Sequence, residues 1–595
     1  MKFFVIGNGS IQAGIDLKYL TPLGSRGSNF AQKNQTPEQS FFIAQNIFRL
    51  VGKGEINFVL IGLAPEALFL DENNRLTVAA LDKNLQTLNK ILELCADNGA
   101  QPVGVILPVA PPTREYYRKN FLNLLADTVN KLGKIKVLNF LNLNLGENYF
   151  VDETHLTPTG ATLMSTLLTM ELYRANIFPK VDFYQMAYEY FYLLSHFTDK
   201  NSFHSLMNEI FSETLTKLRR KEKIRLAFVT DHAAMWCGDK LYNLFAQDPR
   251  FETTVFLCRS HESTMQDFLH DFEQFKAAGL NVIGVSDRNT ETPAQDILFF
   301  LRPYVENFSK NFQFDMMTPE TLLIYIPYGF EIWRTSIFRN LPIFHFAWKH
   351  FSDSEDSLNV FEEACSVGIP RGVVSGAPKL DLFFEDTSKL SFPWKMTRPD
   401  AKKIIWAPHH SEAYSTFPYN FQFMYEFAKA HPETSWVVKP HPRLMLQAIL
   451  TKLFPSAEAY EAYLQKWNDL PNAQVYTGAY YHKIFATSDG MILDSLSFIA
   501  EYQYTHKPMI YLLNDASEEF TELGKKILSV SYLVDGKNRE QISAALMKIF
   551  IEGNDPMKPA RQKVFDEELN YVLRNGMTAS EFIYRAVTKE LEMNS

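Results

Sequence analysis

Short apolar runs that alternate with helical stretches constrain this chain more than any other feature. The alternation occupies two separate regions, one over residues 1 to about 175 and one that starts abruptly at the run IRLAFVT, residues 224–230. Neighbouring parallel strands need a crossover connection, which is usually a helix. The pattern therefore predicts α/β domains with largely parallel sheets, and 595 residues are too many for a single core.

The domain boundaries follow from where the alternation stops and resumes. We expect an α/β domain over residues 1–175 and a helical connector over residues 176–223, which lacks strand-like runs. The second region divides into two halves, residues 224–395 and 396–595, each with the strand and helix order of a Rossmann-like fold. Two such halves in succession predict a ligand cleft between them.

The composition excludes several classes of partner and site. A formal net charge of −9 gives no support for a nucleic-acid partner. The four cysteines form no Cys-x-x-Cys pair, which argues against a zinc site or a disulfide scaffold and suits a reducing compartment. The apolar runs are far shorter than the ~20 residues that span a bilayer, and the first run reaches glycine and polar residues too soon for a signal peptide. We therefore expect a cytoplasmic protein.

A basic run at the end of the connector allows two interpretations. A solvated helix end favours positive charge, and this is the more common reason for such a run. The alternative is a weak peripheral contact with the anionic inner face of the cell membrane. The run consists of Lys217, Arg219, Arg220, Lys221 and Lys223.

Polar clusters follow three predicted strands in residues 396–595, at the point where each strand ends. The strands are the runs KKIIWA, SWVV and GMIL. Because ligands of open parallel sheets bind at the carboxyl ends of the strands, we expect the three clusters to converge on one cleft. The clusters are His409 and His410, then Lys439, His441 and Arg443, then Asp494, Ser495 and Ser497.

The third cluster fits a phosphate-binding turn. The run SFIAEYQYT predicts a helix after the strand GMIL, which places Ser495 and Ser497 near the helix N-terminus. Free backbone N–H groups and the positive end of the helix dipole bind anions there, and the hydroxyls add donors. Glu501, further into the helix, is expected to accept hydrogen bonds from a ribose. The alternative is that Asp494 or Ser495 only caps the helix.

His441 lies between two prolines, with Lys439 and Arg443 beside it. This setting favours an imidazole that faces a phosphate, either as an acid–base group or as a donor to the anion. His409 and His410 are adjacent, and adjacent side chains generally point in different directions, so we expect at most one of the two to face the ligand. No Asp-x-Asp pair is prominent, so we do not expect the site to require a metal.

Residues from about 225 to 550 resemble the CDP-glycerol glycerophosphotransferase family, the teichoic-acid and capsule polymerases. The resemblance rests on the motifs WAPHHS, VKPHPR, LDSLSFIAEYQYTHKPMIYL and GAPKLD. It implies a GT-B fold, with residues 224–395 as the acceptor-side half and residues 396–595 as the nucleotide-donor half. It also implies transfer from a CDP-linked polyol or a related nucleotide donor, without a further cofactor. IYIPYGFEIW stands in place of the family's Trp-His-Gly-Thr segment, and Glu501 stands where the family usually has aspartate. The glutamate also suits nucleotide-sugar enzymes of GT-B type.

The first region carries a second set of candidate residues. Ser10 follows the first predicted strand, and Asp152 and His155 lie in the late segment YFVDETHLTPTGA. These features resemble SGNH-type hydrolases and acyltransferases, which implies a flavodoxin-like, three-layer domain. In such enzymes the histidine takes the serine proton and the aspartate orients the imidazole. The alternative is a degenerate domain kept for structure or for acceptor binding.

Three functions are compatible with these features. The leading hypothesis is a transferase of bacterial surface-polysaccharide synthesis, which moves a polyol-phosphate or a sugar from a nucleotide donor to a polysaccharide or lipid-linked glycan acceptor. In that case the SGNH-like module would add or remove an acyl group on the same glycan. The second hypothesis is an O-acetylesterase or acetyltransferase with a non-catalytic GT-B-like platform that binds glycan. The third is a scaffold without catalytic activity.

Overall fold

The protein, represented by a computed structural model, folds into two compact units. One unit comprises Met1–Asn208 with Phe314–Pro319, and the other comprises Glu209–Gln313 with Glu320–Ser595. The structure describes the chain except for residues 1, 8–11, 13–14, 16–25, 33–34, 64–67, 69–76, 121–134, 142, 144, 176, 178–199, 261–262, 288, 305–307, 309–311, 313–320, 331, 334–340, 366–370, 412, 479, 497, 515–518 and 593–595.

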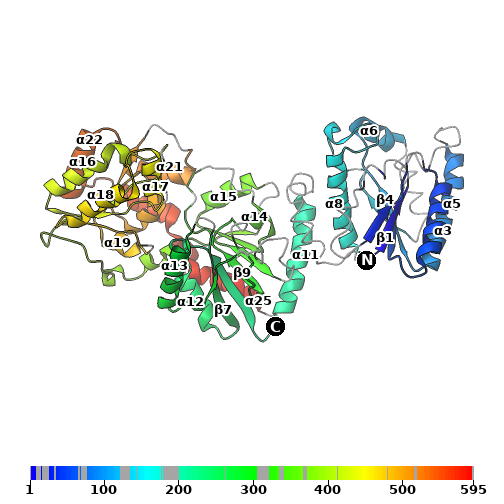
Figure 1. Cartoon of the computed structure of the whole chain (residues 1–595), viewed down its shortest axis with the longest axis horizontal. Helices are drawn as coiled ribbons and strands as arrows, with labels where there is room; N and C mark the ends of the chain where they lie inside the picture. Colours follow the sequence, from blue (N-terminus) through cyan, green and yellow to red (C-terminus); the bar gives the residue numbers. More distant parts are fainter. Residues whose placement is uncertain are drawn as a thin grey trace. The chain divides into compact units, whose positions relative to one another are not determined.

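The first unit is built on a five-stranded parallel sheet with the strand order β2-β1-β3-β4-β5. This is the flavodoxin-like order. Helices α3 and α5 cover one face of the sheet and α8 covers the other, which gives three layers (Figure 1). The elements are β1 Lys2–Ile6, β2 Arg26–Asn29, α3 Pro37–Val51, β3 Phe58–Gly62, α5 Val78–Asp97, β4 Gln101–Ile106, α6 Pro111–Asn120, β5 Lys136–Asn139 and α8 Pro158–Arg174.

The second unit contains two further sheets, and the first of them has seven parallel strands in the order β12-β11-β10-β9-β6-β7-β8. The chain leaves β6 toward β7 and β8 and returns to β9 on the other side of β6. The crevice between the ends of β6 and β9 is therefore the place where the strand order reverses. The elements are β6 Ile224–Thr230, α12 Asp239–Gln247, β7 Phe251–Cys258, α13 Met265–Ala277, β8 Val282–Val285, β9 Ile297–Phe300, β10 Leu322–Tyr325, β11 Lys349–Ser352, α15 Glu355–Ala364 and β12 Gly372–Val374.

The last sheet has six parallel strands in the order β15-β14-β13-β16-β17-β18. This is the Rossmann order, with the reversal between β13 and β16. Buried Trp406, Trp436 and Trp467 form the centre of its core on one face. The elements are β13 Lys402–Ala407, α16 Phe417–Ala430, β14 Thr434–Val438, α17 Leu444–Leu450, α18 Ala457–Asp469, β15 Ala473–Val475, α19 His482–Thr487, β16 Gly490–Leu493, α20 Phe498–Glu501, β17 Met509–Leu513, α21 Glu522–Ser529, β18 Tyr532–Asp535 and α22 Arg539–Ala545.

A final helix, α25 Ala579–Leu591, follows the last half of the second unit in sequence but contacts the first half. The buried carboxylate of Asp381, in the segment between the two sheets, accepts the N–H groups of Ala579 and Ser580 at 2.9 Å each. The helix then packs on α12, and the Tyr584 hydroxyl donates to Asp248 at 2.8 Å. The last helix of the chain therefore packs on the half that precedes it in sequence.

The expected fold class, α/β with parallel sheets and two successive Rossmann-like halves, is confirmed. The runs IRLAFVT, KKIIWA and GMIL all form strands of these sheets. One expected helix of the connector forms α11, Lys200–Leu218, and the other falls on residues outside the described part. Within the described residues, no helix combines the length and the hydropathy that a bilayer crossing requires.

The basic run after α11 is partly engaged inside the second unit. The Arg219 guanidinium donates to the carbonyl oxygen of Glu590 at 2.7 Å, and Lys221 Nζ donates to Asp296 at 2.6 Å. These contacts favour the interpretation as a helix end. The membrane contact stays a prediction.

Candidate functional site

The three polar clusters at the ends of β13, β14 and β16 come together at one edge of the last sheet. The rings of His409 and His410 lie 4.6 Å apart between centroids, and the rings of His410 and His441 stack at 4.0 Å. The backbone N–H of His409 donates to Asp494 Oδ1 at 2.5 Å, which joins the first cluster to the third. Because β13 and β16 flank the reversal of strand order, this is where an open sheet binds its ligand.

Asp494 holds the loop that carries the histidines. Its side chain is fully buried, and its Oδ2 accepts hydrogen bonds from the backbone N–H and the hydroxyl of Thr416, the latter at 2.8 Å. Burial raises the pKa of this carboxyl, while the N–H groups of Thr416 and His409 act in the opposite direction. Both oxygens already have protein donors, so Asp494 positions His409 and does not itself offer a free group to a phosphate.

Burial favours the neutral form of the clustered histidines, and hydrogen bonds fix the protonated nitrogen in two of them. Burial lowers the pKa of His441 to about 3 and that of His409 to about 4. His441 Nδ1 accepts the backbone N–H of Arg443 at 3.1 Å, and His409 Nδ1 accepts that of Ser411 at 3.2 Å. A neutral imidazole has a single N–H, so in both rings the proton lies on Nε2. His441 and His409 are therefore hydrogen-bond donors at Nε2.

Lys439 supplies positive charge next to these donors. Its side chain is buried, its Nζ donates to the carbonyl of Gly478 at 3.1 Å, and it lies 5.4 Å from the ring centroids of Tyr476 and Tyr481. Burial and, to a smaller extent, the charge of Lys379 lower the pKa of Lys439 to about 8. At neutral pH most Lys439 side chains therefore remain charged, and the ammonium group can attract a phosphate.

The turn after β16 differs from the expected long helix. α20 is a single turn, Phe498–Glu501, and it continues as a 3-10 turn over Tyr502–Thr505. A helix this short has few aligned peptide dipoles, so the helix end contributes little to anion binding. Ser495 is buried beside Asp494, and Ser497 lies outside the described residues. The imidazoles and Lys439 thus offer more to a phosphate than the helix end does.

Glu501 lies at the centre of the second unit and already has two partners. Its carboxylate accepts the Tyr481 hydroxyl, and Lys379 Nζ lies 3.4 Å from Oε1. Burial, above all other causes, raises the pKa of Tyr481 well above its usual value. A ribose hydroxyl at Glu501 would have to share or replace these contacts, so ribose binding stays a prediction.

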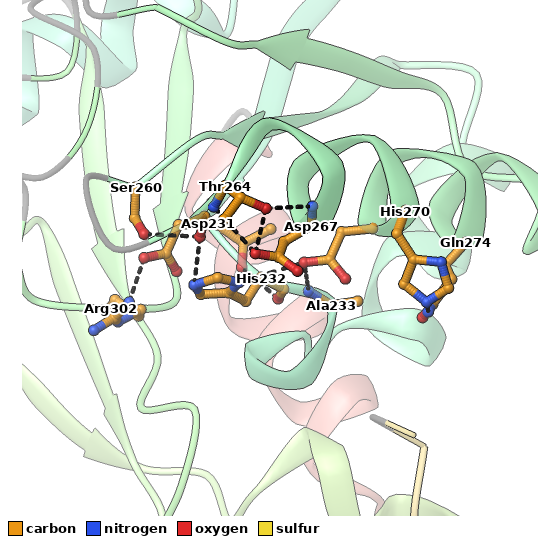
Figure 2. Close-up of polar contacts among 12 residues, drawn as sticks. Asp231, His232, Ala233, Ser260, Thr264, Asp267, His270, Gln274 and Arg302 are labelled. Carbon is orange, nitrogen blue, oxygen red and sulfur yellow. Dashed lines mark hydrogen bonds and ion pairs between the residues drawn. The ribbon is translucent and has the colours of Figure 1, made fainter. Parts of the chain in front are cut away.

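The other half of the second unit has a crevice of its own between the ends of β6 and β9. Asp231 directly follows β6, and its fully buried carboxylate pairs with Arg302, which follows β9 (Figure 2). Asp231 Oδ1 and Arg302 Nε have no hydrogen-bond partner among the described residues. Burial raises the pKa of Asp231, and the Arg302 guanidinium opposes that shift.

His232 adjoins this ion pair and is held between an aspartate and a serine. Its Nδ1 lies 3.4 Å from Asp271 Oδ2, and its Nε2 lies 3.0 Å from the Ser263 hydroxyl, which in turn lies 3.0 Å from that of Ser260. The hydrogen bond to Asp271 raises the pKa of His232, although burial opposes it. A carboxylate at Nδ1 requires a proton on that nitrogen, so in the neutral ring Nε2 is an acceptor.

The two crevices are linked through the loop after β10. The Arg302 guanidinium carbon lies 6.0 Å from the ring centroid of Tyr328. The Tyr328 carbonyl oxygen lies 3.5 Å from Lys379 Nζ, the same ammonium that pairs with Glu501. The neighbouring Gly329 has only Glu501 Oε1 near the place where a side chain would begin, at 3.9 Å. A chain of contacts therefore joins Arg302, in the crevice at β6 and β9, to the buried carboxylate of Glu501 in the other half.

A pocket of about 450 Å³ lies between the two halves of the second unit. Its wall comes from α12 and the loop before it, from the segment between the two sheets, and from the start of α19 and the loop before it. Aromatic faces and planar polar groups share this wall, which suits a polyhydroxylated ligand. These side chains include Trp236, Lys240, Asn243, Gln247, Glu385 and Tyr480.

In the first unit, Asp152 and His155 form the contact that the sequence predicts. His155 Nδ1 lies 2.8 Å from both carboxylate oxygens of Asp152, and an antiparallel bridge between Phe150 and Leu156 closes the turn. Burial acts to raise the pKa of Asp152, but the N–H groups of Thr154 and His155 outweigh it and leave the pKa lowered. Ser10 lies outside the described residues, so its relation to His155 stays a prediction.

The sequence analysis missed the crevice between β6 and β9. The signal was available in part, because Asp231 and His232 directly follow a predicted strand, as the three clusters of the other half do. Ser263 and Asp271 gave no such signal, since they reach His232 only through the fold. In the described part of the chain, no group of three or more His, Cys, Asp or Glu side chains could hold a metal ion.

Comparison with known proteins finds only distant likeness. No protein-family model and no curated protein matches the chain. A UDP-GlcNAc 2-epimerase from Neisseria meningitidis bound to UDP-GlcNAc is 14% identical over 62% of this chain and 100% of that chain, with a TM-score of 0.42. A variant of the wall teichoic acid polymerase TagF is 11% identical over 72% and 97%, with a TM-score of 0.42. A glycosyltransferase from Rickettsia africae is 12% identical over 63% and 100%, with a TM-score of 0.37. Function is therefore argued from the side chains of this chain.

Proposed function

We propose that the second unit is a transferase of bacterial surface-polysaccharide synthesis. It moves a polyol-phosphate or a sugar from a nucleotide-activated donor to a hydroxyl group of a glycan acceptor. The observation that carries the proposal is the group of neutral imidazoles at the ends of β13 and β14, where His441 and His409 donate from Nε2 beside the charged Lys439.

This group suits the phosphate that leaves during transfer. When the donor bond breaks, negative charge grows on the phosphate oxygen, and preorganised N–H donors stabilise it. Neutral imidazoles can do this without the repulsion that stacked imidazolium rings would suffer at 4.0 Å. The same arrangement serves a CDP-linked polyol, which leaves CMP, and a sugar nucleotide, which leaves a nucleoside diphosphate.

Release of nucleotide tests the proposal directly. Purified full-length protein is incubated with CDP-glycerol, CDP-ribitol or UDP-GlcNAc, and free CMP or UDP is measured. His441→Ala is expected to lower the release rate about 10²-fold. His441→Gln retains an N–H donor near the position of Nε2 and should recover part of the rate, which it would not do if His441 acted as a base. Absence of release from every donor contradicts the proposal.

The first unit is proposed to be an esterase or acyltransferase that acts on the same glycan. The observation that favours it is the 2.8 Å contact between His155 Nδ1 and Asp152, which leaves His155 Nε2 as the acceptor for a serine proton. Hydrolysis of p-nitrophenyl acetate should fall about 10³-fold in Ser10→Ala and His155→Ala. Undiminished hydrolysis in Ser10→Ala would exclude that serine as nucleophile. The first unit alone would account for activity if nucleotide release fails while ester hydrolysis persists.

A further inference from the structure

We propose that His232, at the crevice between β6 and β9, takes the proton from the acceptor hydroxyl, in the half of the second unit that is expected to hold the acceptor. This inference rests on the proposed transferase function and names its acceptor side. The acceptor class is a polyhydroxylated molecule, a sugar or a polyol chain. Asp271 is the positioning residue that sets the orientation and the proton of the imidazole.

The geometry around His232 is that of a base. Its Nδ1–H faces the Asp271 carboxylate, which also accepts the backbone N–H of Ala233 at 3.2 Å and is thereby fixed in place. Its Nε2 lone pair faces the Ser263 hydroxyl at 3.0 Å. A carboxylate, an imidazole and a hydroxyl in this order form the arrangement by which enzymes activate an O–H group. An acceptor hydroxyl that replaces the Ser263 hydroxyl at Nε2 would be activated in the same way.

Two buried polar atoms beside His232 lack partners, and these point to a ligand. Asp231 Oδ1 and Arg302 Nε have no hydrogen-bond partner in the described part of the chain, although Asp231 is 3% exposed. A buried polar atom without a hydrogen-bond partner is uncommon in proteins and calls for an explanation, even where the rest of its group is paired. A hydroxyl of a bound polyol can donate to the carboxylate oxygen, and another can accept from the guanidinium. The ion pair thus offers contacts for hydroxyl groups next to the reacting one.

Contacts connect this crevice to the half of the second unit that holds the donor in the proposed function. Arg302 reaches Glu501 through Tyr328 and Lys379 by the contacts given above. The charge of Asp271 also acts on the hydroxyl of Tyr480, which belongs to the other half of the unit and lines the shared pocket. Among the described residues, the charged groups that act on His232 are Asp271, Asp231 and Arg302, and His232 in turn acts on Asp267 of α13. Side chains of both halves of the second unit therefore connect the proposed acceptor side with the donor side.

The transfer step balances without a further reactant. The acceptor oxygen forms a bond to the transferred atom of the donor, which is phosphorus in a CDP-linked polyol and carbon in a sugar nucleotide. The bond from that atom to the nucleotide phosphate oxygen breaks, and the phosphate leaves with its electron pair. The acceptor proton passes to His232 Nε2, and the imidazolium is stabilised by Asp271. His441 and His409 donate hydrogen bonds to the leaving phosphate.

Kinetics of transfer to glycerol or methyl glucoside, with the donor that the release assay identifies, test the assignment. His232→Ala should lower kcat about 10²- to 10³-fold and leave the donor affinity, measured by calorimetry, within twofold. Asp271→Asn should lower kcat about tenfold and shift the acid limb of the profile of kcat against pH to lower pH, because the hydrogen bond that raises the pKa of His232 is weakened. His270→Ala is the matched control, since this exposed histidine on α13 contacts Gln274 and lies apart from His232 (Figure 2).

A chemical readout keeps the test independent of turnover. The rate of carbethoxylation of His232, followed by peptide mass spectrometry, should have its midpoint above pH 6.5 in the wild type and at lower pH in Asp271→Asn, and glycerol or methyl glucoside should slow it. An unmoved midpoint in Asp271→Asn together with unchanged kcat in His232→Ala overturns the inference. A loss in Ser263→Ala as large as that in His232→Ala would make Ser263 the nucleophile and also overturns it. Failure of the wild type to bind any nucleotide is recognised separately, because it removes the proposed function while the carbethoxylation result stands.

Discussion

Histidines line both crevices of the second unit, but the hydrogen-bond partner of Nδ1 is a donor in one crevice and an acceptor in the other. At the end of β13 and β14, His409 and His441 accept backbone N–H groups at Nδ1 and therefore carry the proton on Nε2. At the end of β6, His232 faces the Asp271 carboxylate with Nδ1 and therefore keeps its lone pair on Nε2. Burial lowers the pKa of the first two, whereas the hydrogen bond to Asp271 raises the pKa of His232.

This difference shows that the hydrogen-bond partner of Nδ1 decides whether Nε2 of an imidazole is a donor or an acceptor. A backbone N–H makes the ring a donor, which suits a phosphate that gains charge. A carboxylate makes the ring a base, which suits a hydroxyl that loses its proton. The residue type alone does not separate these roles, and the following changes test the separation from either side.

The largest effect is expected for Asp494→Ala, which removes the group that holds the donor-side histidine loop. The change leaves buried donors of His409 and Thr416 unpaired, so the free energy of unfolding should fall by about 3 kcal/mol. The donor affinity should fall about 10²-fold with it. Urea unfolding can be followed by tryptophan fluorescence, because three of the seven tryptophans are buried in the core of this half.

Two variants control this experiment. Asp494→Asn retains one acceptor oxygen and should lose less than half as much stability. Asp489→Asn changes an exposed carboxylate at the other end of β16, which accepts one hydrogen bond from the Lys403 N–H, and should cost less than about 1 kcal/mol. Loss of stability in Asp494→Ala with unchanged donor affinity would separate the loop from the donor site and break the comparison.

An intermediate effect is expected for Lys439→Met. If Lys439 attracts the donor phosphates as proposed, the loss of this positive charge beside His441 should weaken donor binding about tenfold at pH 7. Because the pKa of Lys439 lies near 8, the wild-type ammonium loses its proton as pH rises from 7 to 9, so donor affinity should fall over this range. The Lys439→Met variant should show no such slope by calorimetry, whereas the exposed Lys466→Met should match the wild type. A wild-type affinity that is constant to pH 9 contradicts the role of this lysine.

Most strands were predictable from the sequence. A strand that was missed, β11, shows why other strands cannot be predicted in this way. β13, β14 and β16 are apolar runs bounded by polar residues, which is the pattern of a strand buried on both faces. β11 has the sequence KHFS, and its burial comes from the fold, since the His350 ring is enclosed by Tyr325, Phe344 and Phe361. No local pattern marks such a strand, because its partners are supplied by other elements.

The candidate site divides in the same way. The rule that ligands bind where parallel strands end located His409, His410 and His441 from sequence, and it applies equally to His232. The role of Asp494 was not predictable, because its partner Thr416 is 78 residues away in the chain. Asp271 lies 39 residues from His232 and reaches it from the middle of α13. Sequence locates the strand ends, and only the fold shows what occupies Nδ1.

The smallest effect is expected for the acid range of donor binding. The pKa values of His409 and His441 lie near 4 and 3, so both rings stay neutral as pH falls from 7 to 5. Affinity for an intact donor, whose phosphates are esterified and do not titrate in this range, should therefore change less than twofold. Turnover should fall over the same range, since His232 gains a proton and can no longer act as a base.

A rise in donor affinity toward pH 5 would mean that the donor-side rings become charged, and the contrast between the two crevices would then be lost. A constant donor affinity together with a falling kcat between pH 7 and pH 5 would assign the fall in kcat to His232 at the end of β6. Protonation of that ring removes the Nε2 lone pair that accepts the proton, whereas His409 and His441 stay neutral over this range.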